Sequence, residues 1–203
     1  MRGQPEERTV EERERLRWTF DRVAQLYDEA RPGYPDELFD GLTDLSGIPP
    51  GGRVLEIGSG TGHATVPLAR RGYSVLGVEL GENLAAVARE KLAGFPDTKV
   101  RTGLFEEQPL EGESFDLAVC ASAFHWFDRE AAYRKVQLAL RPGGALALLW
   151  KPRTGSGRAM VSQKLCRRST NERPRRSHGR SPVVAPRTRT RRPRSGRQVS
   201  SAR

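Results

Sequence analysis

Hydrophobic residues after position 50 alternate between short apolar runs and longer segments with helical spacing. The apolar runs have the length and the β-branched content of buried strands. They lie at residues 53–57, 74–80, 99–102, 115–121 and 145–150. The segments between them predict helices at about 61–71, 82–92 and 128–140. Strands that alternate with helices predict an α/β fold with a doubly wound, mostly parallel, Rossmann-like sheet over residues 51–150.

Residues 1–50 carry helical spacing only, and they predict an N-terminal helical cap. Thr9 and Glu12 form a capping-box pattern that begins a helix, and Pro32 ends that helix. We expect one apolar face on this helix, made of Leu16, Phe20, Val23 and Tyr27. We expect a second helix that ends near Gly47, with inward-facing Leu38, Phe39, Leu42 and Leu45.

Residues 151–203 differ sharply in composition from the rest of the chain. They contain no aromatic residue apart from histidine, 17 Lys and Arg, and a single acid, Glu172, so the net charge of +10 comes from this segment. Without an apolar period, the segment predicts a disordered basic tail. We favour the hypothesis that it is an out-of-frame translation; the alternative is a tail that binds nucleic acid. The strand at 145–150 would then have an unprotected edge.

The cysteines and the hydropathy pattern narrow the class of protein. Cys120 and Cys166 make neither a disulfide framework nor a metal-ligand spacing, so we expect no metal, and we expect Cys120 to be a buried apolar residue. No apolar stretch approaches the ~20 residues of a membrane span. The N-terminus has no apolar leader. We therefore expect a cytoplasmic protein without a membrane partner.

A glycine-rich turn between the first strand and the first helix of the sheet is the strongest chemical signal. Gly58, Gly60 and Gly62 would let a ligand approach the backbone N–H groups closely. The dinucleotide fingerprint requires a sixth-position glycine, where this chain has His63. Glu56, two residues before the turn, suits a ligand with sulfonium and ammonium charges better than a pyrophosphate. The turn therefore favours S-adenosylmethionine over NAD.

A second acid follows the second strand. Glu79 lies 21 residues after Gly58, at a strand end where a carboxylate can accept hydrogen bonds from both ribose hydroxyls. This position does not by itself separate the two cofactors, and a solvent-exposed strand-end acid is the alternative interpretation.

From Phe20 to Trp150 the chain resembles class I S-adenosylmethionine-dependent methyltransferases of the methyltransferase type 11 group. The segments that carry the resemblance are residues 54–62, 77–79, 115–117, 123–127 and 140–144. The resemblance implies S-adenosylmethionine as cofactor and a sheet of seven strands, of which this chain offers five. Much of the acceptor pocket would lie in the missing part, so we expect cofactor binding to be retained more readily than turnover.

The resemblance also implies roles for individual residues at the cofactor. The methionine part would lie against Glu56, Gly58, Ser59, Gly60 and Gly62. Glu79 would hold the ribose and Leu80 would pack on the adenine, with Phe105 and Glu106 beside it. Gly103 and Leu104 stand where relatives commonly carry an aspartate for the adenine amino group.

The acceptor side follows from the same resemblance. The segment from Ala121 to Phe124, after the fourth strand, would border the sulfonium and the methyl acceptor. Tyr27, Arg31 and Tyr34 would fold over the site as a lid, or form a rigid turn. His125 is a candidate general base; the alternative is that it belongs, with Trp126, to an aromatic wall of the pocket.

These patterns predict a methyltransferase that acts on an unidentified small-molecule acceptor and is impaired by the loss of C-terminal strands. Two other functions stay open. One is an NAD-linked oxidoreductase domain, which His63 and Glu56 disfavour. The other is a protein that binds nucleic acid through its basic tail.

Overall fold

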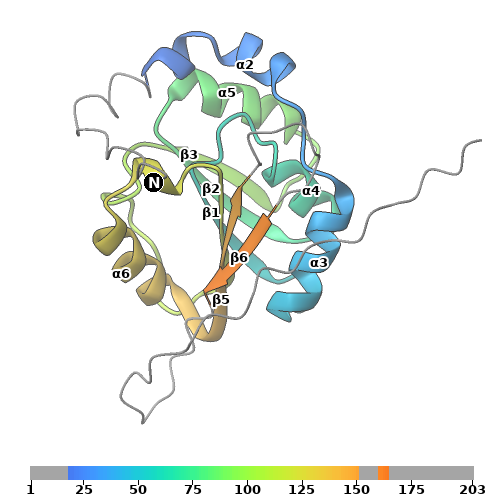
Figure 1. Ribbon diagram of the computed structural model, residues 1–203, viewed down its shortest axis with the longest axis vertical. Coiled ribbons are helices and arrows are strands. Elements are labelled where there is room, and N and C mark those ends of the chain that lie inside the picture. The colour runs from blue at the N-terminus through green and yellow to red at the C-terminus, as the bar shows by residue number, and fades with distance from the viewer. Residues whose placement is uncertain (1–17, 151–159, 165–203) are drawn as a thin grey trace, which may run out of the picture.

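A computed structural model describes residues 18–150 and 160–164 of the chain (Figure 1). Six strands form one sheet in the order β3-β2-β1-β4-β5-β6, with β1 to β5 parallel and β6 antiparallel to β5. The strands are β1 (Arg53–Ile57), β2 (Ser74–Glu79), β3 (Thr98–Thr102), β4 (Phe115–Ala121), β5 (Leu140–Trp150) and β6 (Met160–Lys164). The predicted α/β class and the doubly wound parallel order are confirmed.

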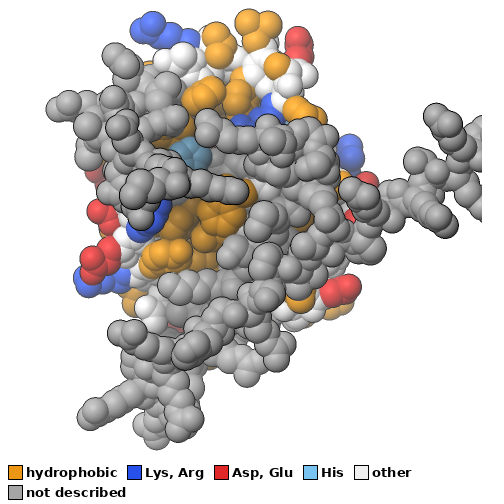
Figure 2. All heavy atoms as spheres, viewed as in Figure 1, with side chains coloured by type: hydrophobic (Ala, Val, Ile, Leu, Met, Phe, Trp, Pro, Cys, Tyr) orange, Lys and Arg blue, Asp and Glu red, His pale blue; other side chains and the backbone are white. Residues whose placement is uncertain are grey.

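Helices cover both faces of the sheet because successive strand side chains point to opposite faces. On one face, α3 (Asp36–Ser46) and α4 (Thr65–Arg70) share a buried cluster with Val54 and Leu117. On the other, α6 (Arg129–Ala139) packs against a cluster that contains Leu55 and Ile57. Helix α5 (Glu82–Lys91) packs near β3. In the view of Figure 2, hydrophobic side chains gather between α6 and β5.

The N-terminal cap is helical as predicted, but its first helix is broken and turned. Residues 18–22 are helical, a turn follows at Val23, and α2 (Ala24–Ala30) continues to the turn at Pro32. The predicted apolar face is wrong: Phe20 and Val23 are exposed, whereas Asp21 and Ala24 are buried. The reason is that the buried carboxylate of Asp21 hydrogen-bonds the start of α5 and sets the rotation of the helix. The positions of Thr9, Glu12 and Leu16 lie outside the described residues.

The second cap helix and the last helix agree with the sequence patterns. α3 buries Leu38, Phe39 and Leu42 and ends at Gly47, whose φ is 64°. The predicted burial of Leu45 is wrong, because this side chain is 39% exposed at the last turn of α3. The backbone N–H of Ala131 donates to the Asp128 side chain, which therefore caps α6 as predicted.

The first helix after the glycine turn starts later than predicted. α4 begins at Thr65 rather than at residue 61. The cause is the backbone of the turn, in which Gly58, Gly60 and Gly62 have φ values of 69°, 56° and 85°. These left-handed conformations do not fit an α-helix, so the first helical turn follows them.

Strand β5 is longer and less regular than the predicted strand at 145–150. Leu140 already pairs with Phe115, the next register pair joins Ala145 to Leu117, and the intervening residues form a bulge rather than a separate turn. Arg141 forms an ion pair with Asp116 in this bulge.

The predicted unprotected edge of β5 is wrong, because β6 pairs with it from Leu146–Lys164 to Trp150–Met160. The sheet therefore has six strands and not five. Backbone N–H and C=O groups on a sheet edge accept a short extended segment whatever its overall composition. The remainder of the predicted tail, with Cys166, lies outside the described residues.

Three further observations concern only residues 18–150 and 160–164. Cys120 is a buried free thiol, as predicted, and burial raises its pKa. In this part of the chain no helix is long and apolar enough to span a bilayer. These residues also bring no three His, Cys, Asp or Glu side chains together as a metal site.

Candidate functional site

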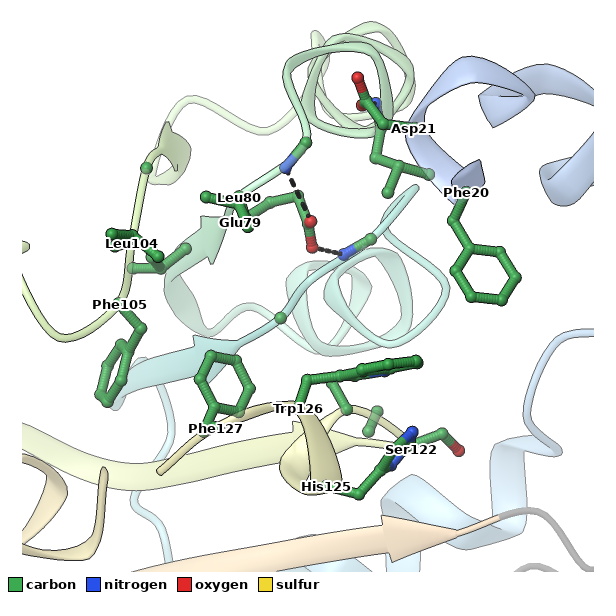
Figure 3. Close-up of a pocket in the computed structure, with 18 of the residues that line it drawn as sticks. Phe20, Asp21, Glu79, Leu80, Leu104, Phe105, Ser122, His125, Trp126 and Phe127 are labelled. Carbon is green, nitrogen blue, oxygen red and sulfur yellow. Dashed lines mark hydrogen bonds between the residues drawn. The ribbon is translucent and has the colours of Figure 1, made fainter. Parts of the chain in front are cut away.

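A cavity of about 1200 Å³ lies at the carboxyl ends of β2 and β4, beside the glycine turn (Figure 3). The strand β1 has β2 on one side and β4 on the other, so the chain reverses its direction of winding here. Ligands of open α/β sheets bind at this kind of switch point. The cavity is large enough for a ligand of cofactor size together with a second small molecule.

Glu79 at the end of β2 directs its carboxylate into this cavity (Figure 3). Its two oxygens accept hydrogen bonds from the backbone N–H groups of Gly60 at 2.7 Å and Gly81 at 3.0 Å. Burial raises the pKa of this carboxyl group above its ordinary value, and the hydrogen bonds from Gly81 and Gly60 lower it in part. The carboxylate therefore ties the glycine turn to the turn after β2.

The glycine turn forms the floor of the cavity through Gly58 and Gly60. A Cβ atom at Gly58 would lie 2.6 Å from the Cβ of Ala123, which follows β4, whereas a Cβ at Gly60 would meet nothing within 4 Å. Gly62 and Ser59 do not line the cavity: Gly62 faces Ala88 of α5, and Ser59 is buried. Gly58 is thus required for the close approach of the β1 and β4 ends, and Gly60 for backbone conformation.

Glu56 lies on β1, is 1% exposed, and does not line the cavity. Burial raises its pKa to about 8; the nearby Thr65 hydroxyl offsets part of the rise, and the charge of Glu79 adds to it. Within the described part of the chain, its Oε2 atom has no hydrogen-bond partner. A buried carboxyl group with an unused acceptor is stabilised by a positive charge placed near it.

Apolar side chains form the walls on either side of Glu79. Leu80 and Leu104 lie near Glu79, and the rings of Phe105, Phe127 and Trp126 lie across the cavity from it (Figure 3). The Phe105 and Phe127 rings meet edge to face, with centroids 5.9 Å apart. These surfaces suit a flat heteroaromatic group that stacks or packs between them.

The N-terminal cap supplies a wall that the sequence analysis largely missed. Trp18, Phe20 and Asp21 line the cavity. The Asp21 carboxylate accepts hydrogen bonds from Asn83 N at 2.9 Å, Asn83 Nδ2 at 3.0 Å and Leu84 N at 3.1 Å. Asp21 therefore caps α5 from 62 residues away in sequence, and no local pattern could have indicated the pairing.

Two predicted lid residues, Tyr27 and Arg31, do line the cavity. The Arg31 guanidinium donates to the Tyr27 hydroxyl and lies 5.1 Å from the Tyr27 ring centroid. Burial raises the pKa of Tyr27, while the charge of Arg31 acts in the opposite direction. Among the ion pairs of the described residues, none involves Arg31. Arg31 therefore offers a positive charge to an anionic group of a ligand.

The segment after β4 contains the candidate base and Ser122, which lies within the predicted 121–124 segment. His125 lines the cavity but is exposed, and its ring packs against Trp126 with centroids 4.6 Å apart. Ser122 also lines the cavity and has a positive φ of 57°. The contact between the His125 and Trp126 rings is what the aromatic-wall interpretation of His125 expects.

The structure gathers ten of the sixteen predicted site residues around the cavity. These are Tyr27, Arg31, Gly58, Gly60, Glu79, Leu80, Phe105, Ala121, His125 and Trp126. The other six do not line it: Glu56, Ser59, Gly62, Tyr34, Glu106 and Phe124.

Three of these six have side chains or backbone groups engaged elsewhere. Phe124 packs on Tyr133 of α6, with ring centroids 4.8 Å apart. Tyr34 packs on Phe39 of α3. The backbone oxygen of Glu106 accepts a hydrogen bond from Lys135.

The cavity therefore combines a carboxylate for paired hydroxyl groups, a glycine floor, apolar walls for a flat ring and a buried acid near the floor. These features fit a nucleoside that carries a positive charge close to the glycine turn.

Comparisons with known proteins agree with this geometry. A family model described as a methyltransferase domain matches residues 55–148. The uncharacterized methyltransferase-like protein C25B8.10 of Schizosaccharomyces pombe is 37% identical over 136 residues, covering 66% of this chain and 52% of that protein. The uncharacterized methyltransferase Rv3342 of Mycobacterium tuberculosis is 37% identical over 135 residues, covering 66% and 53%. The chain thus spans about half the length of these curated relatives.

Solved structures show the same fold. Phosphoethanolamine N-methyltransferase 2 of Haemonchus contortus, in complex with S-adenosyl-L-methionine, has a TM-score of 0.58 at 23% identity, covering 74% of this chain and 38% of that one. The [4+2]-cyclase SpnF has a TM-score of 0.60 at 21% identity, covering 70% and 62%. At these identities the likeness concerns the fold alone.

Proposed function

Residues 55–148 belong to the class I S-adenosylmethionine-dependent methyltransferases, and from this premise we propose that the protein transfers a methyl group from S-adenosylmethionine to a small-molecule acceptor. The observation that carries the proposal is the Glu79 carboxylate, which faces the cavity beside the Gly58–Gly62 turn. A carboxylate at this place accepts hydrogen bonds from paired ribose hydroxyls.

The cofactor would supply an electrophilic methyl group on a sulfonium ion. In our proposal Glu79 holds the ribose, the turn at Gly58 and Gly60 receives the methionine part, and Leu80 with Phe105 encloses the adenine. Leu104 lines the cavity near Glu79, so it would give the adenine an apolar contact.

Charged residues around the cavity complement the charges of this cofactor. The buried carboxyl group of Glu56 would be stabilised by the sulfonium and ammonium charges. Arg31, from the lid pair Tyr27 and Arg31, would offset the charge of the methionine carboxylate.

The acceptor side of the proposal depends on alignment more than on a strong base. His125 is exposed and packs on Trp126, so we assign it to the pocket wall, with the role of general base as the alternative. Transfer to a nucleophilic atom requires chiefly that this atom and the S–CH₃ bond are in line. The acceptor, the absence of a nucleic-acid or membrane partner, and the cytoplasmic location stay predictions.

Two measurements test the proposal on the full chain. Calorimetric titration with S-adenosylhomocysteine should give a saturable heat, whereas NAD should give none. Tritium transfer from methyl-labelled S-adenosylmethionine into a metabolite extract should then exceed that of a Glu79→Ala variant. The second measurement is needed because the same fold occurs in a [4+2]-cyclase. A folded sample that binds NAD but not S-adenosylhomocysteine would overturn the proposal.

A further inference from the structure

Ser122, directly after β4, has an unusual backbone for a residue with a side chain. Its φ is 57°, and among the described residues the only other non-glycine residue with a positive φ is Glu113. Left-handed backbone is unfavourable for residues with a Cβ atom, and it persists where surrounding contacts impose it. Glu113 does not line the cavity, whereas Ser122 does. The strained position is therefore part of the site.

Contacts from two other elements hold Ser122 in this conformation. Its backbone N–H donates to the carbonyl oxygen of Leu149 on β5 at 2.8 Å. Its hydroxyl oxygen lies 3.0 Å from the hydroxyl oxygen of Tyr34, within hydrogen-bond distance. Tyr34 belongs to the turn before α3, 88 residues away in sequence, so this hydrogen bond joins the N-terminal cap to the end of β4.

Tyr34 acts from within the core. Its side chain is 9% exposed and belongs to the buried cluster beneath α3. Its ring meets Phe39 edge to face, with centroids 6.2 Å apart. Because this packing fixes the ring, the hydroxyl group of Tyr34 has a fixed position from which to orient the hydroxyl group of Ser122.

The two residues next to Ser122 in sequence carry no polar side chain. Ala121 and Ala123, on either side of it, also line the cavity. Figure 3 shows Ser122 on the same side of the cavity as His125 and Trp126, across from Glu79. The end of β4 thus presents one hydroxyl group between two alanines, with the His125 ring as the other polar group on this side.

We infer that Ser122 hydrogen-bonds the nucleophilic oxygen or nitrogen atom of the methyl acceptor, and that Tyr34 is the positioning residue that holds the Ser122 hydroxyl group for this contact. The inference rests on the proposed function and narrows its substrate class, because a ring-carbon nucleophile gains nothing from such a hydrogen bond. A hydroxyl group with one hydrogen-bonding partner fixed by the protein keeps a defined direction for the other. That direction restricts where the acceptor atom can lie, which is the requirement of an in-line transfer.

The experiment compares binding of four probes to the complex of the full chain with S-adenosylhomocysteine. Benzoate, phenol and aniline carry a hydrogen-bonding atom, and toluene is the apolar probe of similar shape. Dissociation constants come from ligand-observed NMR titrations. We expect the wild-type complex to prefer at least one polar probe over toluene. Loss of one neutral hydrogen bond should reduce this preference about tenfold in Ser122→Ala and in Ser122→Gly.

Three variants separate positioning from general stability. Ser122→Gly removes the hydroxyl group and also relieves the left-handed backbone, so its thermal midpoint should not fall. Tyr34→Phe should reduce the preference for polar probes by a smaller factor. Tyr73→Phe is the matched control. Tyr73 belongs to the same buried cluster as Tyr34, its hydroxyl group donates to Thr43, and its side chain does not line the cavity. This variant should leave the preference unchanged.

The outcomes are distinct. Unchanged preference in Ser122→Gly, or a wild-type complex that binds no polar probe better than toluene, would overturn the inference. An equal loss in Tyr73→Phe and Tyr34→Phe would overturn the positioning role. Failure of the wild-type chain to bind S-adenosylhomocysteine is a separate result that counts against the proposed function itself.

Discussion

The two walls of the cavity are built in different ways. The polar groups of the wall that we assign to the cofactor are backbone N–H groups and one carboxylate within residues 58–81, and Leu80 and Phe105 supply its apolar part. The wall that we assign to the acceptor contains Ser122, which is held by Tyr34 from a distant part of the chain. The polar groups of the cofactor wall therefore depend on two neighbouring strand ends, whereas the acceptor wall depends in addition on a contact with the N-terminal cap.

The largest effect should come from the close approach at the floor of the cavity. Gly58→Ala combines a positive φ with a Cβ atom 2.6 Å from Ala123, and we expect it to lower the free energy of unfolding by about 3 kcal/mol. Gly60→Ala is the matched control with a positive φ and no contact within 4 Å, and it should cost about 1 kcal/mol. Urea denaturation measures both. Equal losses would show that the close approach at Gly58 carries no extra cost.

Removal of the carboxylate at the end of β2 should affect the cofactor wall alone. Glu79→Ala loses a charged hydrogen-bond acceptor, so the dissociation constant of S-adenosylhomocysteine should rise about 100-fold. Glu79→Gln keeps the shape and one oxygen acceptor, and the rise should be about tenfold. Calorimetry gives both values, with circular dichroism to establish folding. Affinities within threefold of the wild type, on the order of experimental scatter, would contradict the role of Glu79.

The next prediction concerns the docking of the N-terminal cap rather than the binding of the cofactor. Asp21→Ala leaves three donors at the start of α5 without their acceptor, and we expect a loss of about 1–2 kcal/mol in the free energy of unfolding. Asp128→Ala, which removes a single exposed cap bond on α6, should cost about 0.5–1 kcal/mol. If the two losses are equal, Asp21 serves as an ordinary helix cap, and its link between the N-terminal cap and α5 adds no further stability.

The last effect is a pH dependence of stability that comes from the buried acid on β1. Burial raises the pKa of Glu56 from 4.5 to about 8, so between these values the folded chain holds a proton that the unfolded chain has released. The contribution of Glu56 to stability is therefore present below pH 4.5, falls as the pH rises, and is lost once the pH passes about 8.

The slope from this single group is at most about 1.4 kcal/mol per pH unit. Glu56→Gln should remove it, which urea denaturation at about pH 5.5 and about pH 7.5 measures. Parallel pH profiles of the wild type and the variant would show that Glu56 ionises normally.

The comparison of the two walls also explains what the sequence could predict. The strands, the glycine turn and the place of Glu79 follow from patterns within a few residues, and the structure agrees with them. The hydrophobic spacing predicts a start for α4 that is too early, because this spacing does not reveal the left-handed backbone of the three glycines.

Long-range contacts account for the other differences. The hydrogen bonds of Asp21 and Tyr34 span 62 and 88 residues, so no local pattern contains them, and they decide which faces of the cap are buried. Strand β6 was missed because its pairing with β5 uses backbone groups, which every residue type apart from proline supplies in full.

The docked cap has a consequence for how such a protein could diversify. Residues before β1 contribute to the cavity wall, and α3 anchors them in the core of the sheet domain, with Asp21 and Tyr34 as further hydrogen-bonded anchor points. A different N-terminal segment that kept these anchor points would bring new side chains to the cavity while the cofactor wall stayed unchanged. The acceptor specificity could then change by exchange of one short segment, while the sheet and the cofactor wall stay as they are.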